Sequence, residues 1–476
     1  MNSTFHGLET AKRALFAQQN GLYTTGNNIA NANTLGYTRQ RVNFAATEGW
    51  PPASMNRSQF AGQLGTGVSA ESIHRVREFY LDVQYRAENA KVGYYASNAS
   101  AMAKLEDILN ETGKDPVGLA RVLNDFRDSW QELSTNPEND GVREVVIQRG
   151  HAVADTFQHL YNTIQFYRQD LGKQVDGDVD KINSLLRGID DLNRQIAQME
   201  PHGYLPNNLY DERDRLVDEL SGYMAIEVEK IPGESNGNAK AIAEGIYVIR
   251  VNGIEIVNKD RYLELQVDRQ DGYVANVSFG GVPVEFEDLP LGKMKSLIEN
   301  YGYDDGKGTY PELLAKLDSL ADEFAANVNG AHAKGFKKDG QQGGNLFIEG
   351  AGAAGIKMLD QIEPDDLAPS LTIDGSGDGK NARNVAESIQ GVMSEYERMI
   401  GRIGVEAQFA NQQRKSAATL KTAVEENRLS VGTVSLDEEM MDMIKFQHAY
   451  NAAARTITVI DEMLDKIVNG MGVGGR

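Results

Sequence analysis

Apolar residues recur every seven positions at both ends of the chain. Near the start, the residues at this spacing are Leu8, Leu15, Leu22 and Ile29. Near the end, two interleaved sets share the spacing: Leu436, Met443, Tyr450, Ile457 and Leu464, and Phe446, Ala453, Ile460 and Ile467. A seven-residue apolar repeat is typical of a narrow helical seam that packs against another helix. We therefore expect residues 1–45 and 433–476 to be the two halves of one terminal coiled-coil domain.

The heptad seams do not specify which chain supplies the covering helix. The partner can be the opposite end of the same chain or a helix of a neighbouring copy. Long helices with one narrow apolar stripe bury too little surface to be stable alone. We expect both kinds of contact, one within the chain and one between copies.

A long helical block follows the first seam. Residues from about Arg77 to Leu220 carry the apolar period of helices, and Asp115-Pro116 predicts a helix start inside this block. One apolar face after that start is formed by Leu119, Val122, Leu123, Phe126, Trp130 and Leu133. Pro51 to Gly67 has the composition of an extended loop. We expect residues 46–222 to form the first part of a bundle of antiparallel helices.

The apolar period changes from helical to alternating between Ala225 and Glu287, where Asn-Gly and Asp-Gly pairs separate the runs. This pattern favours an antiparallel β domain inserted at residues 223–310, on an outer face and with few core contacts to the helices. Helical spacing returns over residues 311–432, apart from a glycine-rich stretch at 335–379. The expected fold is mainly α with an inserted β domain, an α+β multidomain chain.

The composition argues against several classes of function. Lysine and arginine number 48 against 69 aspartates and glutamates, so the formal net charge of -21 repels nucleic acids and anionic membrane surfaces. The chain has no cysteine, which excludes disulfides and thiol nucleophiles. The segment from Met1 to Phe16 is too polar for a signal-peptide core. We expect no nucleic-acid partner and no membrane insertion.

The common catalytic motifs are missing from the sequence. It has no His-Glu-x-x-His helix, no Gly-x-Ser-x-Gly elbow and no Gly-x-x-x-x-Gly-Lys phosphate loop. Asp374 to Gly379 begins like a calcium loop, but Val385 stands where a bidentate glutamate is needed, which favours a solvated turn. Acidic runs such as Asp211-Glu212 are expected on solvated helix faces. We predict no catalytic, metal-binding or cofactor-binding residues and no enzymatic activity.

The segment after the first seam has a general and a specific interpretation. Its asparagines are suited to ending a helix, and Gly36 to taking the positive φ of a turn, with Tyr37 as a packing anchor. Taken whole, residues 28–40 (Asn-Ile-Ala-Asn-Ala-Asn-Thr-Leu-Gly-Tyr-Thr-Arg-Gln) resemble the N-terminal signature of flagellar rod, hook and hook-associated proteins. The resemblance marks these residues as an assembly element: Asn28, Ile29, Asn31, Asn33, Thr34, Gly36 and Tyr37. Val434 to Met440, with Phe446 to Tyr450 and Arg455, resembles the C-terminal signature of the same axial family.

The middle of the chain favours one group of proteins within this axial family. Rod and hook subunits place mostly β structure between their ends, whereas the hook-associated proteins of the hook-to-filament junction have long internal helices, as expected here. Ala331 to Phe336 and Asp374 to Ala382 are also similar to the internal pattern of the junction proteins. The departures are Thr38, where serine is common, His448, where glutamine is common, and the tail from Gly470 to Arg476.

The resemblance implies a secreted structural subunit of the extracellular bacterial flagellum that joins hook to filament. It also implies export through the flagellar type III apparatus, an export chaperone on the C-terminal region, and a ring of identical subunits at the hook tip. The implied partners are hook subunits and other hook-associated proteins. The alternatives are another axial protein, such as a hook or rod subunit, and a self-standing coiled-coil surface fibre.

Overall fold

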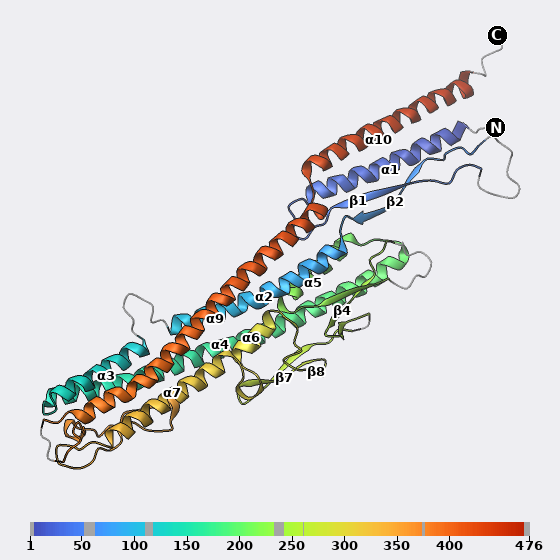
Figure 1. Ribbon diagram of the computed structural model, residues 1–476. Helices are drawn as coiled ribbons and strands as arrows, with labels where there is room; N and C mark the ends of the chain where they lie inside the picture. The colour runs from blue at the N-terminus through green and yellow to red at the C-terminus, as the bar shows by residue number, and fades with distance from the viewer. Residues whose placement is uncertain are drawn as a thin grey trace, which may run out of the picture.

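The computed structural model describes residues 4–51, 62–109, 118–232, 242–259, 261–373 and 377–470. Figure 1 shows an elongated molecule, with the first and last helices side by side at one end and a bundle of long helices forming the rest. The long helices are α1 (Thr4–Ala30), α2 (Phe79–Ile108), α3 (Leu119–Thr135), α4 (Asp140–Met199), α5 (Asn207–Tyr223), α7 (Thr309–His332), α9 (Lys380–Gly432) and α10 (Leu436–Asp465). The short helices are α6 (Lys293–Tyr301), α8 (Gly352–Gly355), η1 (Glu200–His202), η2 (Asp304–Gly306), η3 (Pro364–Asp366) and η4 (Lys466–Gly470).

In the part of the chain that the structure describes, three small antiparallel sheets accompany the helices. The first is the hairpin of β1 (Gln40–Ala46) and β2 (Val68–Arg75). The second has the order β3 (Glu227–Ile231), β4 (Ile246–Val251), β5 (Ile254–Val257), and the third β6 (Leu265–Gln270), β7 (Tyr273–Phe279), β8 (Val282–Val284). The predicted fold class, mainly α with an inserted β region, is confirmed. The division of the chain at residues 45, 222, 310 and 432 remains a prediction.

The bundle core forms where the apolar period predicted it. On α3, five of the six residues of the expected apolar face are fully buried, and Val122 packs at the edge of the core. The ring of Phe126 lies 5.8 Å from that of Phe324 and 6.0 Å from that of Phe347, centroid to centroid, which brings α3, α7 and the glycine-rich stretch together. The predicted helix start at Asp115-Pro116 and most of the loop from Pro51 to Gly67 lie outside the described residues.

The hairpins of the β insert turn at the predicted dipeptides. Asn252-Gly253 joins β4 to β5 and Asp271-Gly272 joins β6 to β7, and all four residues have positive φ. Two consecutive positive φ values define the turn whose twist matches that of a β-hairpin, and glycine takes this conformation without steric cost.

The expectation that the insert shares few core contacts with the helices is wrong. Tyr247 and Ile249 of β4 are fully buried and belong to the same apolar core as α4 and α5. Two asparagines of α4 act as strand partners: the amide of Asn193 pairs with both backbone groups of Tyr247, at 2.8 and 3.1 Å, and that of Asn183 with both of Leu265, at 3.0 and 2.7 Å. The insert is therefore part of the bundle core, since apolar side chains and α4 amides cover its inner face.

Candidate assembly site at the paired ends of the chain

α1 and α10 run antiparallel and in contact along most of their length (Figure 1). A Cβ on Gly21 would lie 3.0 Å from the Phe446 ring, and one on Gly7 would lie 3.3 Å from Ile460. The two glycines therefore allow the large side chains of α10 to approach the backbone of α1 closely. The pairing joins residues from the two ends of the sequence, as one of the two contacts expected from the heptads requires.

The predicted seam residues lie at different depths in this pair. Those that are buried or half-buried are Leu8, Leu15, Leu22, Ile29, Met443, Phe446, Tyr450, Ala453, Ile457, Ile460 and Leu464. Leu436 and Ile467, at the two ends of the C-terminal seam, are about half exposed, at 51% and 48%. Their role in assembly remains a prediction.

Asn28 is the polar centre of the pair and is only 1% exposed. Its amide nitrogen donates to Gln40 O at 2.8 Å and to Glu439 Oε2 at 3.0 Å, and its Oδ1 accepts from Tyr37 OH at 2.8 Å and from Gln40 N at 3.0 Å. All four hydrogen-bonding positions of the amide are thus used, which is what burial of a polar side chain requires. One side chain ties together α1, the start of β1, the turn and α10.

Asn31 and Thr34 of the signature form hydrogen bonds within the turn that follows α1. The Asn31 amide donates to Asn27 O and to Asn27 Oδ1, both at 3.0 Å, and the Thr34 hydroxyl donates to Asn31 Oδ1 at 3.2 Å. Gly36 has a φ of +82°, a conformation that favours glycine. Asn33 and Thr34 are exposed. The structure therefore brings Asn28 and Tyr37 into one network, and leaves Asn33 on the surface.

Tyr37 and Arg39 connect this turn to acidic groups. Burial, followed by the nearby charges of Asp211 and Glu439, raises the pKa of Tyr37 to about 12. Arg39 forms ion pairs with Glu439 at 2.7 Å and with Glu438 at 2.6 Å, in the first turn of α10. Glu439 is 2% exposed and is fully compensated by Asn28 and Arg39, so the start of α10 is held to the turn by charge-assisted hydrogen bonds.

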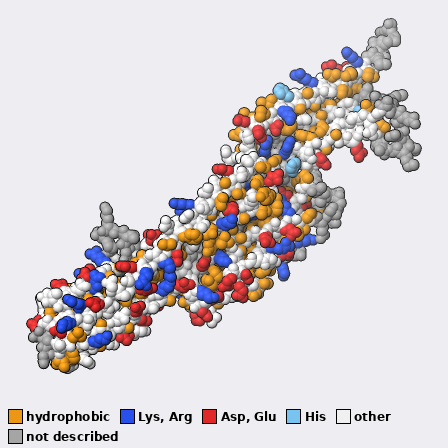
Figure 2. All heavy atoms as spheres, in the orientation of Figure 1, with side chains coloured by type: hydrophobic (Ala, Val, Ile, Leu, Met, Phe, Trp, Pro, Cys, Tyr) orange, Lys and Arg blue, Asp and Glu red, His pale blue; other side chains and the backbone are white. Residues whose placement is uncertain are grey.

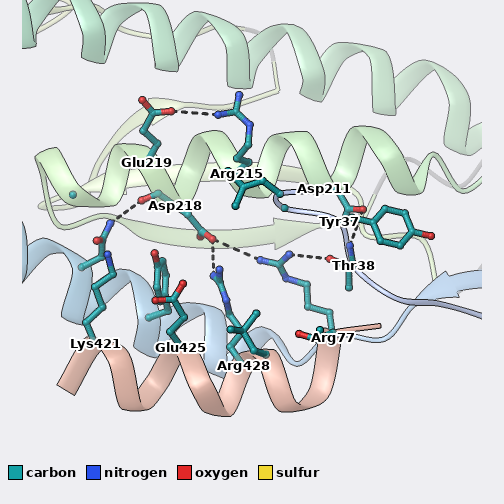
Figure 3. Close-up of a pocket in the computed structure, with 18 residues that line it drawn as sticks. Tyr37, Thr38, Arg77, Asp211, Arg215, Asp218, Glu219, Lys421, Glu425 and Arg428 are labelled. Carbon is teal, nitrogen blue, oxygen red and sulfur yellow. Dashed lines mark hydrogen bonds and ion pairs between the residues drawn. The ribbon is translucent and has the colours of Figure 1, made fainter. Parts of the chain in front are cut away.

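A cleft of about 510 Å³ lies where the terminal pair joins the bundle (Figure 3). Side chains from the turn, α2, α5 and α9 line it, and Figure 3 shows Arg77 and Arg428 both reaching toward Asp218. Arg428 is 2.6 Å from this carboxylate, and the backbone N–H of Thr38 donates to Asp211 at 3.2 Å. The connection between the two parts of the molecule is therefore largely polar.

Behind this cleft lies a buried ion network. Asp214 is 1% exposed and lies 2.8 Å from Arg75, 3.0 Å from Arg86 and 3.4 Å from Arg77. Burial by itself raises the pKa of the Asp214 carboxyl, but the surrounding guanidinium groups outweigh burial and hold this pKa well below its usual range. The network links β2, α2 and α5.

The expectation that Asp211-Glu212 belongs to a solvated face is half wrong. Glu212 is exposed, but Asp211 is 8% exposed and forms an ion pair with Arg75 at 2.7 Å. The signal that was missed is spacing: residues 211, 214 and 218 are all aspartates and fall on one face of α5, whereas the charge run alone suggested a surface.

Within the described ranges, no group of three or more histidine, aspartate or glutamate side chains is arranged to hold a metal ion. No described helix combines the length and the apolar character needed to cross a membrane. What the described residues show is a contact between two long helices, α1 and α10, that is organised by a buried polar network.

A model of the flagellar hook-associated protein FlgK helical domain matches residues 102–347. Flagellar hook-associated protein 1 of Bacillus subtilis is 44% identical over 517 aligned positions, which cover 100% of both chains. The chain belongs to the flagellar hook-associated protein 1 family. Models of a flagella basal body rod protein and of the flagellar basal body rod FlgEFG protein C-terminal region match residues 8–38 and 426–470. Family membership confirms the resemblance inferred from the two terminal signatures.

More distant relatives of the family match a smaller part of the chain. Flagellar hook-associated protein 1 of Escherichia coli is 28% identical over 72% of this chain and 60% of its own length, and that of Salmonella typhimurium is 27% identical over 72% and 59%. The solved flagellar hook junction protein FlgK from Burkholderia pseudomallei aligns with a TM-score of 0.46 at 22% identity, over 56% of this chain and 46% of that one.

Proposed function

We propose that this chain is a structural subunit that joins hook to filament in the bacterial flagellum, and that it assembles as a ring of identical copies at the hook tip. Family membership supports a flagellar structural role, and the names of the relatives are consistent with a position at the hook. Under this proposal the chain has no enzymatic activity. It is exported through the flagellar type III apparatus, held by an export chaperone at its C-terminal region, and functions outside the cell.

The observation that carries the proposal is the exposed apolar surface of the terminal helix pair. On α1, Phe16 is 53% and Tyr23 is 66% exposed. On α10, a second stripe outside the seam is exposed, formed by Met441 (65%), Ile444 (54%), Val459 (50%) and Met463 (53%). Figure 2 shows hydrophobic side chains along this end of the molecule. Exposed apolar surface of this extent is typical of a protein–protein interaction site.

The two stripes are chemically suited to each other. Aromatic side chains lie on α1, and methionine and aliphatic side chains lie on α10, a pairing that favours sulfur–aromatic contacts. Contact between the α10 stripe of one copy and the α1 stripe of the next is heterologous, and repeated heterologous contacts close into a ring when the rotation allows it. The proposed neighbours above and below the ring are hook subunits and other hook-associated proteins.

The proposal is tested by deleting the gene in its host and imaging the cells. We expect hooks without filaments and filament protein released into the medium, with filaments restored when the intact gene is returned. Loss of the hooks themselves would instead indicate a hook or rod subunit. Normal filaments on the deletion cells would contradict any role at the junction.

A further inference from the structure

The most exposed methionines among the described residues are concentrated on one helix. Met440, Met441 and Met463 of α10 are 55%, 65% and 53% exposed. Met199 of α4 is 39% exposed, and Met443 of the inner seam is half-buried. The methionines of the bundle core are at most 6% exposed: Met102, Met224, Met294, Met358, Met393 and Met399. Solvent therefore reaches the thioethers of α10 far more readily than those of the core.

We propose that Met441 and Met463 in the exposed stripe of α10, together with Met440 beside Met441, are oxidation sites at which peroxide converts the free subunit to a form that cannot assemble. The inference rests on the proposed function, because it assigns a consequence to the exposed stripe of α10. Thioether oxidation follows exposure, so these three side chains react before those of the bundle core.

The reaction needs only the thioether and a peroxide. A lone pair of the sulfur attacks one peroxide oxygen, the O–O bond breaks as the S–O bond forms, and the departing hydroxide takes the peroxide proton to become water. The sulfur is oxidised by two electrons and the peroxide is reduced by two. The product is a sulfoxide, which methionine sulfoxide reductases return to the thioether.

The position of the three residues determines what oxidation changes. Met441 and Met463 belong to the stripe that also contains Ile444 and Val459, so a sulfoxide places a polar oxygen in the middle of an apolar surface. Burying that oxygen against a neighbouring copy without a hydrogen-bond donor is unfavourable. The inner seam is covered by α1, so the terminal pair of the monomer remains formed. A subunit already in the ring has this stripe covered and is protected.

The test uses the purified full-length chain and hooks isolated from cells that lack its gene. The chain is treated with hydrogen peroxide, quenched, and its oxidised methionines are identified by peptide mass spectrometry. Sedimentation with the hooks then measures binding before and after treatment. We expect residues 440, 441 and 463 to gain oxygen before the methionines of the bundle core. We expect hook binding to fall by about tenfold or more, which corresponds to a loss of at least 1.4 kcal/mol.

Two variants locate the effect. One is the triple variant Met440→Leu, Met441→Leu, Met463→Leu, whose hook binding should be nearly the same before and after peroxide treatment. Because each variant is compared with its own untreated form, any change that the substitutions cause in basal binding cancels. The matched control Met393→Leu, in the bundle core, should remain as sensitive as the unaltered chain. Equal loss of binding by the triple variant, or earlier oxidation of the core methionines, would overturn the proposed site. Failure of the untreated chain to bind hooks would overturn the proposed function and this inference with it.

Discussion

The amide of Asn28 on α1 donates a hydrogen bond to the carboxylate of Glu439 on α10 at 3.0 Å, between residues that are 411 positions apart in the sequence. Both side chains are at most 2% exposed. The contact helps to set the register of the helix pair, because a shift of either helix would cost the buried carboxylate and the buried amide one hydrogen-bond partner each. Register in turn decides which apolar residues of α1 and α10 face outward.

Replacing Asn28 by alanine should loosen the terminal pair. The change removes four hydrogen bonds and leaves Glu439 Oε2 and the Gln40 N–H buried with fewer partners, at a cost of roughly 1–3 kcal/mol. Hydrogen exchange measured by mass spectrometry should become faster in α1 and α10 and stay unchanged in α4. The control Asn33→Ala removes an exposed asparagine of the same turn and should leave exchange unaltered. Unchanged exchange in Asn28→Ala would show that the network does not hold the pair.

Replacing Ile457 by aspartate should impair assembly and spare the bundle. Ile457 is half-buried in the α10 seam, so the change removes roughly 1–3 kcal/mol of apolar burial and adds a charge beside apolar neighbours. The variant should be secreted without restoring filaments. Thermal unfolding of the bundle in the purified full-length variant, followed by circular dichroism, should barely change. Thr458→Asp places the same charge on the exposed polar face and should restore filaments. Normal filaments with Ile457→Asp would show that the seam contact between α1 and α10 is not needed for assembly.

Replacing Asp214 by asparagine should destabilise the connection between hairpin, α2 and α5. Removing one partner of a buried ion network leaves the opposing charges uncompensated, at a cost of roughly 3–5 kcal/mol. Urea unfolding should show the loss as a lower midpoint. Glu212→Gln, on the same helix, breaks only an exposed ion pair with Arg215 and should shift stability by about 1 kcal/mol or less. A similar midpoint for both variants would contradict the importance of the buried site.

Mild acid should lower the stability of the region where α7 meets the glycine-rich stretch at residues 335–379, through protonation of His332. This side chain is 1% exposed; its Nδ1 lies 2.7 Å from Gly344 O, its Nε2 accepts from Ala368 N at 2.9 Å, and burial lowers its pKa to about 4. Between pH 6.5 and 4 the unfolded chain binds a proton at this residue that the folded chain does not. The free energy of unfolding therefore falls as the pH falls through that window, by roughly 3 kcal/mol.

The His332 contribution is isolated by comparing slopes of stability against pH. Lys337 and Asp366, which face the ring as an ion pair at 2.7 Å, are present in every variant and do not affect the comparison. His332→Gln should flatten the slope between pH 6.5 and 4, whereas His159→Gln, which removes an exposed histidine of α4, should keep the slope of the unaltered chain. Identical slopes in all three chains would refute the assignment.

Replacing Asn193 by alanine should detach β4 from α4. The amide pairs with both backbone groups of Tyr247 and also accepts from Arg213 at 3.2 Å, so the change leaves several buried groups unpaired at a cost of roughly 1–3 kcal/mol. Amide exchange in β3 to β5 should accelerate. Asn208→Ala removes an exposed asparagine of α5 as a control. Protected strands in Asn193→Ala would restore the idea of a self-contained insert.

Local patterns predicted the elements, because an apolar period is a property of neighbouring residues. The α3 face and the Asn-Gly and Asp-Gly turns are examples. The β1–β2 hairpin was missed because only Val42 of β1 is buried, so no alternation marks the strand. The N-terminal signature contains Asn28 and the C-terminal signature contains Glu439, but their contact could not be inferred, because nothing local in the sequence links the two residues.

Buried charge was the other failure of prediction. A run such as Asp211-Glu212 is expected to be solvated unless a guanidinium group from elsewhere compensates it. Here Arg75 of β2 pairs with Asp211, and Arg86 of α2 pairs with the neighbouring Asp214. The shared core of the insert was missed for a related reason. From the sequence alone, Asn183 and Asn193 are expected on the polar surface of α4, and only the structure shows that β6 and β4 pack against them.

The pairing of the first helix with the last also fixes an order of events in folding. α1 can pack on the β1–β2 hairpin early, but its helical partner α10 becomes available only after nearly all of the chain has been made. The neighbouring segments of the bundle can meet much earlier. Contacts between distant segments form late, because a long loop must be closed before they are gained. The helix pair is therefore completed last, and a chain that stops short of α10 presents a folded bundle with an unpaired α1. Under the proposed function, completion of the subunit and its readiness to polymerise therefore depend on the same contact.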